Sequence, residues 1–215
     1  MSIQVVLADD HHMIRQGLRA LIEKEDGISV IAEAKDGREA VETVRELRPD
    51  VVVMDIGMPN MNGIEATRQI VAELADVKVL ALSMHSDKRF VREMFAAGAS
   101  GYLLKDSAFH ELALAIRTLA KDGTYLSPGV ADSVIKDFVD RRPESDVSVF
   151  SLLTARQREV LQLTAEGNST KDIAALLSVS VKTVESHRLK IMEKLDVHSI
   201  AELTKYAVRE GLTSI

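Results

Sequence analysis

The sequence predicts an α/β domain built on a parallel sheet, followed by a smaller all-α domain. Over residues 3–123, short apolar segments alternate with amphipathic helical patterns five times in succession, which is typical of a parallel sheet with helices on both faces. Helical patterns with no strand between them then occupy the C-terminal part. We expect one domain at residues 1–124, a second at 151–215, and between them a linker with a short helix at 125–150, with the domain boundary near Pro143.

The strands of the first domain are predicted from apolar segments that end at turns or polar residues. They lie at Ile3–Ala8, Ile28–Ala34, Val51–Asp55, Val77–Ser83 and Gly101–Leu104. Five strands, each followed by a helical pattern, favour a flavodoxin-like (βα)5 fold with strand order 2-1-3-4-5. The helices are expected from apolar residues at helical spacing, namely Met13 to Ile22, Ala40 to Leu47, Ile64–Leu74, Arg89–Ala97 and Phe109–Leu119.

Carboxylates follow two of the predicted strands. Asp9 and Asp10 come after the first strand, and Asp55 closes the third. These strands are neighbours in the predicted order, and parallel strands bring their carboxyl ends to one edge, so the three side chains converge. Clustered carboxylates repel one another unless a cation lies among them, and an oxygen-only site with room for water suits Mg²⁺. The backbone carbonyl of Gly57 is a further candidate ligand.

Two further polar residues are expected at the same edge. Ser83 ends the fourth strand and Lys105 follows the fifth. A hydroxyl donor and an ammonium suit the oxygens of an incoming phosphoryl group, so we interpret the edge as an acceptor site with Asp55 as nucleophile. Taken singly, these residues also fit ordinary roles, such as a helix cap, a turn or a solvated charge. Adjacent His11 and His12 are expected to cap or pack the first helix rather than to bind a transition metal.

The acidic site carries a resemblance to a known domain. The chain resembles the receiver domain of bacterial two-component response regulators from Ile3 to near Gly123, at Asp9-Asp10-His11, Asp55 with Met58-Pro59, Ser83, and Ala97 to Lys105. The resemblance implies that Asp55 takes a phosphoryl group from a sensor histidine kinase. It implies that Asp10 binds Mg²⁺ directly and Asp9 through water, and that Ser83 and Tyr102 move together as a switch.

The C-terminal part has the pattern of a helix-turn-helix domain. One helix starts at Leu153-Thr154 and ends at Gly167, and a short one opens at Ser169-Thr170. A third helix is expected from Val181 to Leu195 and a fourth from Ile200 to Arg209. Two helices joined by a tight turn are typical of this motif, whose second helix lies in the DNA major groove.

The outward face of the third of these helices is the candidate DNA surface. Cations can meet phosphates there, Glu185 can accept from a cytosine amino group, and Leu189 can touch a thymine methyl. On charge alone, a solvated face of a four-helix domain explains these residues equally well. The residues expected to face DNA are Lys182, Thr183, Glu185, Ser186, His187, Arg188, Leu189, Lys190 and Lys194.

A second resemblance favours the DNA interpretation. The segment Leu152–Leu212 resembles the LuxR-type helix-turn-helix of NarL/FixJ-type transcription regulators. The matching stretches are Leu153–Leu161, Lys171–Ala174, Thr183–His187, Lys194-Leu195 and Ala201–Leu203. The resemblance places base-reading positions at Glu185, Ser186 and Leu189, and makes the last helix the dimer helix of the DNA-binding domain.

Composition and charge narrow the classes of protein to which this chain can belong. The absence of cysteine excludes disulfides and thiolate chemistry and suits the cytoplasm. No secretory signal pattern opens the chain, and no apolar run reaches the roughly 20 residues of a membrane span, so we expect a cytoplasmic protein with no membrane partner. The net charge is −6. Residues 148–215 hold 9 Lys+Arg and 8 Asp+Glu, a net of +1, so the rest of the chain carries the acidic excess, a net of −7. The C-terminal part therefore suits a different partner.

These observations predict a phosphorylation-switched DNA-binding regulator that forms a homodimer when phosphorylated. Its partners are a sensor histidine kinase and double-stranded DNA, and it is not an enzyme. The alternative is an aspartyl-phosphate hydrolase of the haloacid-dehalogenase type, which has a second Asp two residues after the nucleophile, where Gly57 stands. A scaffold independent of phosphate is a third hypothesis, which the intact acidic site disfavours.

Overall fold

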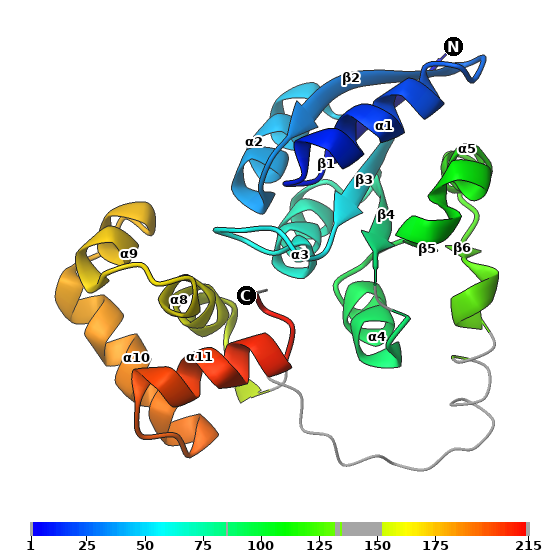
Figure 1. Cartoon of the computed structure of the whole chain (residues 1–215). Helices are drawn as coiled ribbons and strands as arrows, with labels where there is room; N and C mark the ends of the chain where they lie inside the picture. The colour runs from blue at the N-terminus through cyan, green and yellow to red at the C-terminus, as the bar shows by residue number, and fades with distance from the viewer. Residues whose placement is uncertain (1, 85, 132–133, 135–151, 214–215) are drawn as a thin grey trace. The chain divides into compact units, whose positions relative to one another are not determined.

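The chain divides into two compact units, with the boundary in sequence after residue 143 and residues 59–61 grouped with the second unit. The computed structural model describes residues 2–84, 86–131, 134 and 152–213. The N-terminal unit is a sheet covered by helices and the C-terminal unit is all-helical (Figure 1). Each unit has its own hydrophobic core. The predicted pairing of a flavodoxin-like α/β domain with an all-α domain is confirmed.

A six-stranded parallel sheet organises the N-terminal unit. Its order is β2-β1-β3-β4-β5-β6, which confirms the predicted 2-1-3-4-5 and adds an edge strand. Every residue of β3 is buried, as expected for a central strand covered on both faces. The strands are β1 (Ile3–Ala8), β2 (Ile28–Ala34), β3 (Val51–Asp55), β4 (Lys78–Ser83), β5 (Gly101–Leu104) and β6 (Tyr125–Leu126).

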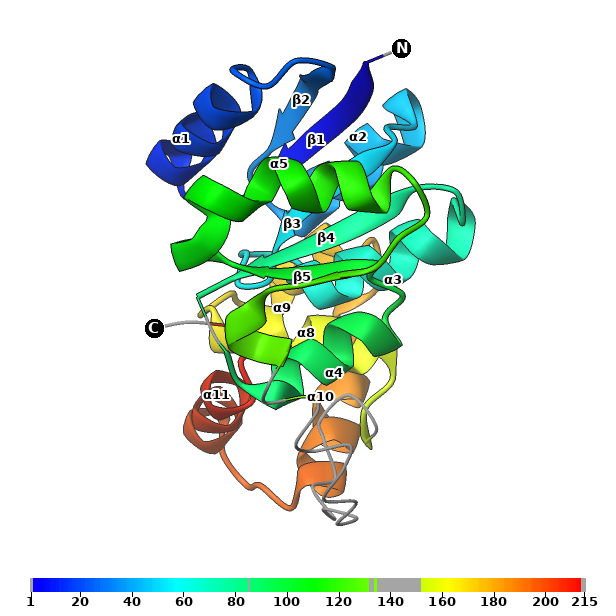
Figure 2. The same cartoon turned by 90° about the vertical axis from the view of Figure 1, so that its right-hand side faces the viewer.

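Helices cover both faces of this sheet. Figures 1 and 2 show α1 and α5 on one face and α2, α3 and α4 on the other. A short 3-10 helix, η1 (Lys105–Ser107), follows β5 and was not predicted. Asp36, Asn62 and Asp87 accept backbone N–H groups at the starts of α2, α3 and α4. The helices are α1 (His12–Ile22), α2 (Gly37–Leu47), α3 (Gly63–Glu73), α4 (Lys88–Ala96) and α5 (Ala108–Leu119).

Strand β6 extends the sheet into the segment that was predicted as linker. Tyr125 pairs with Gly101 and Leu126 with Tyr102. The hydroxyls of Tyr125 and Ser127 both donate to Glu111 on α5, at 2.7 and 2.9 Å. A strand of two residues has too few positions to show an apolar period, so the sequence pattern does not mark it. The predicted linker helix begins within residues 128–131, and the rest of that segment, 132–133 and 135–151, lies outside the described residues.

The C-terminal unit packs its helices around one apolar core. Its described helices are α8 (Ala155–Ala165), α9 (Thr170–Leu176), α10 (Val181–Leu195) and α11 (Ile200–Arg209). The bounds of α10 and α11 are those predicted from the sequence. Each begins at a hydroxyl, from Thr154, Ser169, Ser180 and Ser199, that accepts a backbone N–H. Such a cap contributes about 1 kcal/mol. Nowhere in the described part of the chain is a helix both long and apolar enough to cross a membrane.

Candidate phosphoacceptor site and DNA-facing helix

The carboxyl end of the sheet brings the predicted acidic residues together with Lys105. Asp9 and Asp10 follow β1, Asp55 closes β3, and Lys105 follows β5. The Lys105 Nζ atom lies 2.8 Å from Asp9 Oδ2 and 3.0 Å from Asp55 Oδ2. One ligand atom each from Asp9, Asp10, His11 and Asp55 lies within 4.8 Å of the others. The arrangement follows from the strand order, because β1 and β3 are neighbours.

Burial and charge set the electrostatics of this site. The pKa of Asp55 is raised above its ordinary value, chiefly by burial. The ammonium of Lys105 opposes that rise, and the charges of Asp9 and Asp10 add to it. Burial disfavours the charged form of Lys105, but the charges of Asp55 and Asp9 outweigh it and raise the pKa of Lys105. Lys105 is therefore a charged ammonium held between two carboxylates.

The same carboxylates fit a hard divalent cation. Asp9 Oδ2 and Asp10 Oδ1 are buried atoms that accept no hydrogen bond of good geometry from a described residue, although Lys105 Nζ and His11 Nδ1 each approach one of them at 2.8 Å. Oxygens with unused lone pairs are what Mg²⁺ takes as ligands. The exposed Gly57 lies two residues beyond Asp55, and its role as a carbonyl ligand stays a prediction.

A close backbone contact fixes the end of β3. A Cβ atom added to Gly63 would lie 2.0 Å from the backbone oxygen of Asp55. The Gly63 N–H donates to the carbonyl of Ile56 at 2.9 Å, and Asn62 caps α3 at the same point. The β3–α3 connection therefore folds back onto the strand that carries Asp55, and only glycine fits. The sequence pattern indicates that Gly63 is a loop residue, but it does not reveal this close contact.

The predicted switch residues are in contact. Ser83 and Tyr102 are both buried; Ser83 ends β4, and Tyr102 is the second residue of the neighbouring strand β5. Burial raises the pKa of Tyr102 to about 12, and a hydrogen bond with Ser83 acts in the opposite direction. The structure thus joins the phenol to the serine at the edge where Asp55 lies. Their joint movement stays a prediction.

Helix α10 presents an exposed face that can lie against DNA. Lys182, Glu185, Ser186, Leu189 and Lys190 are exposed, and Leu189 keeps 69% of its surface accessible. The opposite side of the helix buries Val184 and Ile191 in the core of the unit. Burial lowers the pKa of the half-buried His187, as do the nearby charges of Arg156 and Lys190. The position of α10 after α9 and a tight turn is that of a recognition helix.

Three of the residues predicted to face DNA have side-chain hydrogen-bond partners within the C-terminal unit. Lys194 Nζ donates to the Leu152 carbonyl at 3.0 Å and to Gln157 Oε1 at 2.9 Å. The Thr183 hydroxyl pairs with the Ser180 hydroxyl at 2.8 Å. Arg188 Nη1 reaches the Thr170 hydroxyl at 3.4 Å. Helical spacing places these side chains near the DNA-facing side, but it carries no information about such partners.

Family models match both units of the chain. The model of the response regulator receiver domain matches residues 5–117. The model of bacterial regulatory proteins of the luxR family matches residues 151–207.

The chain belongs to the response regulators of the NarL/FixJ type.

Named relatives of this response regulator match it over nearly its whole length. Oxygen regulatory protein NreC of Staphylococcus haemolyticus is 39% identical over 98% of this chain and 99% of its own length. Transcriptional regulatory protein DegU of Brevibacillus brevis is 36% identical over 100% of this chain and 96% of its own. Among solved structures, RcsB of Salmonella typhimurium, described in terms of its DNA interaction, is 26% identical, with a TM-score of 0.60 over 97% and 98% of the two chains.

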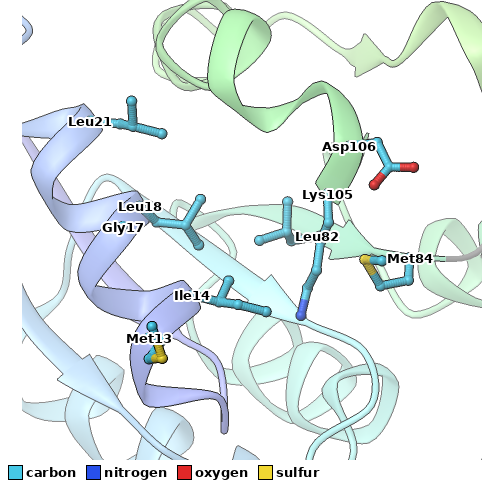
Figure 3. Close-up of a pocket in the computed structure, with 9 residues that line it drawn as sticks. All are labelled: Met13, Ile14, Gly17, Leu18, Leu21, Leu82, Met84, Lys105 and Asp106. Atoms are coloured by element: carbon cyan, nitrogen blue, oxygen red, sulfur yellow. The ribbon is translucent and has the colours of Figure 1, made fainter.

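An apolar cavity opens beside the acidic site of this regulator. It measures about 460 Å³ and is lined by α1, the end of β4 and the start of η1 (Figure 3). Its lining residues are Met13, Ile14, Gly17, Leu18, Leu21, Leu82, Met84, Lys105 and Asp106. Met13 and Ile14 were counted among the apolar residues that predict α1, but 87% and 36% of their surfaces are exposed. The first turn of α1 therefore displays apolar side chains next to the phosphoacceptor.

Proposed function

We propose that this response regulator is switched by a phosphoryl group on Asp55, which it accepts with Mg²⁺ from a sensor histidine kinase. The observation that carries the proposal is the ion pair of Lys105 with both Asp9 and Asp55 at one edge of the sheet. The site joins a carboxylate nucleophile, a fixed cation and two acidic side chains suited to a metal. Few other reactions use these groups in this arrangement.

The residues of the chain have separate roles in the proposed transfer. Asp55 forms the new O–P bond through a carboxylate oxygen, while the P–N bond to a kinase histidine breaks and the imidazole nitrogen keeps the electron pair. Lys105 offers a positive charge to the transferred oxygens, and the Ser83 hydroxyl offers a donor. Asp9, Asp10, Asp55 and the Gly57 carbonyl would hold Mg²⁺, which when bound neutralises the charge that builds up on the phosphoryl oxygens.

The raised pKa of Asp55 is consistent with this role. Burial and the acidic neighbours disfavour the charged form of Asp55, and the ammonium of Lys105 opposes this rise in pKa without cancelling it. A bound cation would act in the same direction as Lys105 and favour the carboxylate form that attacks phosphorus.

The signal is proposed to pass through Ser83 and Tyr102 to the rest of the protein. Phosphate on Asp55 would compete for the Ser83 hydroxyl, which is hydrogen-bonded to Tyr102. The new charge shifts a two-state surface, and the receiver then dimerises or frees the DNA-binding domain. A two-fold dimer suits a two-fold DNA site.

The DNA contacts are proposed for the exposed face of α10. Glu185, Ser186 and Leu189 face the bases, and Lys182 and Lys190 face phosphates. His187, Thr183, Arg188 and Lys194 lie at the margin of this face. The exposure of Leu189 leaves its side chain accessible to a thymine methyl group in the major groove.

We further propose that the protein accepts one phosphoryl group per cycle rather than turning over substrate, and that it works in the cytoplasm with its DNA. Gly57 stands where an aspartyl-phosphate hydrolase of the haloacid-dehalogenase type has its second Asp. Glycine has no side chain that could act as an acid or base there. Loss of the phosphoryl group is therefore left to water at a slow rate.

Intact-mass measurement after incubation with acetyl phosphate and Mg²⁺ tests the acceptor. Wild type should gain one phosphoryl group that maps to Asp55, and Asp55→Ala should gain none. Asp76→Asn is the matched control, because Asp76 is an exposed acid at the opposite end of the sheet, before β4, and it should react as wild type does. Equal labelling of wild type and Asp55→Ala would reject Asp55 as the acceptor.

A further inference from the structure

An ion-pair network on one flank of the acidic site connects α1 to β2. Arg15 on α1 donates through Nε to Glu33 Oε2 on β2 at 2.8 Å, and only 12% and 18% of these two side chains are exposed. Arg19, one turn further along α1, donates to the other oxygen, Glu33 Oε1, also at 2.8 Å. The hydrogen bonds from Arg19 and Arg15 hold the pKa of Glu33 below its ordinary value although its partial burial acts in the opposite direction. Glu33 is therefore ionised and anchored by both guanidinium groups.

Arg15 makes two contacts that Arg19 lacks. Its Nη1 atom donates to the backbone carbonyl of Asp9 at 2.5 Å, and its Nη2 atom lies 3.4 Å from His12 Nδ1. Arg19 makes its further bond to Glu23, at 2.7 Å on the outside of the helix. A planar guanidinium presents its donors in a fixed fork. Glu33 therefore orients Arg15, and Arg15 in turn holds the Asp9 carbonyl.

Asp9 is consequently held at three points. Its N–H donates to the Ala34 carbonyl on β2 at 3.1 Å. Its Oδ1 atom accepts from the His11 N–H at 2.8 Å, and its carbonyl is held by Arg15. These contacts leave Asp9 Oδ2 facing Lys105. Because the peptide unit is planar, fixing the Asp9 carbonyl also fixes the direction in which Asp10 leaves that peptide.

From this geometry we propose that Arg15 is a positioning residue that sets the Mg²⁺ affinity of the phosphoacceptor site. The inference rests on the proposed function, since it takes the acidic site to bind Mg²⁺. Arg15 contacts the backbone carbonyl of Asp9 rather than the carboxylate oxygens that are proposed to hold Mg²⁺. It acts through the peptide between Asp9 and Asp10, which places the two carboxylates that face the cation.

The pair Arg15→Gln and Arg19→Gln tests this role. Each substitution removes one guanidinium that donates to Glu33 at 2.8 Å. Only Arg15→Gln also removes the donor to the Asp9 carbonyl. The Mg²⁺ dissociation constant of the unphosphorylated full-length protein is measured by calorimetry. Arg15→Gln should weaken Mg²⁺ binding by about tenfold, the lower end of the effect known for residues that orient metal ligands. Arg19→Gln should stay close to wild type.

Two further readouts separate positioning from folding. At saturating acetyl phosphate, Arg15→Gln should shift the Mg²⁺ concentration for half-maximal phosphorylation, while its rate at saturating Mg²⁺ approaches that of wild type. Thermal unfolding without Mg²⁺ measures any loss of stability separately, and both Gln variants should remain folded at the temperature of the Mg²⁺ titration. Arg15→Lys, which can reach the Asp9 carbonyl with a single ammonium, should recover part of the affinity.

The outcomes distinguish this inference from the proposed function. If wild type binds Mg²⁺ and Arg15→Gln binds it as tightly as Arg19→Gln does, the positioning role is rejected and the phosphoacceptor proposal stands. If wild type shows no Mg²⁺ binding, both are overturned. A loss of affinity in Arg15→Gln alone, with partial rescue by Arg15→Lys, supports the inference.

Discussion

The two functional surfaces of this response regulator are built in opposite ways. The phosphoacceptor edge is enclosed: Asp55, Asp9 and Ser83 are buried, and Lys105 is held between two carboxylates. The DNA-facing side of α10 is open, with Glu185, Leu189 and Lys190 exposed. Changes at the enclosed site disturb folding and chemistry together, whereas changes on the open face can alter recognition alone.

The largest expected effect is at Gly63, where the enclosed site tolerates no side chain. Gly63→Ala places a Cβ against the Asp55 carbonyl and should reduce the free energy of unfolding by about 3 kcal/mol, the upper range for overpacking. Phosphorylation of Asp55 should fall with it. Denaturant unfolding measures the change.

Gly17→Ala is the control for this clash. A Cβ at Gly17 meets no atom within 4 Å, and its helix α1 should gain about 1 kcal/mol from the better helix former. Equal stability of the two alanine variants would mean that the β3–α3 connection is not fixed as described.

A smaller effect is expected from the charge on Asp55. Because the folded-state pKa of Asp55 is raised, the unfolded chain loses this proton first as the pH rises, and the folded state is then penalised. In Mg²⁺-free buffer, Asp55→Asn should therefore be more stable than wild type at neutral pH. The difference should disappear below the ordinary pKa of an aspartate. A wild type that is as stable as the variant at every pH would contradict the raised pKa of the buried Asp55 carboxyl group.

Substitution of Lys194 tests where the DNA-facing side of α10 ends. Lys194→Met removes the donor to the Leu152 carbonyl and to Gln157 and should lower the stability of the C-terminal unit by about 1 kcal/mol. Lys190→Met, four residues earlier on the exposed face, should leave stability unchanged. Thermal unfolding of both variants decides whether Lys194 is structural.

The smallest effect on folding, and a clear one on binding, is expected at Lys190. Lys190→Ala should weaken binding to all duplexes about equally and reduce the slope of the salt dependence by about one. Its stability should stay within about 0.5 kcal/mol of wild type. Titration of a labelled duplex at several salt concentrations gives the slope. An unchanged slope would place Lys190 away from phosphate.

The sequence predicted the features that depend on apolar period and chain order. The bounds of β1, β3 and α10, the strand order and the meeting of Asp9, Asp55 and Lys105 all follow from those patterns. Residues whose role depends on one tertiary contact were missed. Gly63 is recognisable only when the Asp55 carbonyl is seen against it.

Other differences have similar physical causes. Strand β6 is too short to show a period, and its Tyr125 is recognised only through Gly101 and Glu111. Lys194 lies near the predicted face, but its ammonium is used within the unit. Met13 fits a helical apolar pattern and is nonetheless exposed beside the cavity. Helical spacing gives the side of a helix, not the depth of its burial.

The central claim is that the enclosed site controls the open face. The most direct test is DNA affinity with and without acetyl phosphate and Mg²⁺, measured for wild type and Asp55→Ala on a duplex selected from a random pool by the phosphorylated full-length protein. Phosphorylation should tighten binding in wild type and leave Asp55→Ala unchanged, with sedimentation showing a dimer only for phosphorylated wild type. Equal affinities for both proteins under both conditions would contradict control of DNA binding by Asp55.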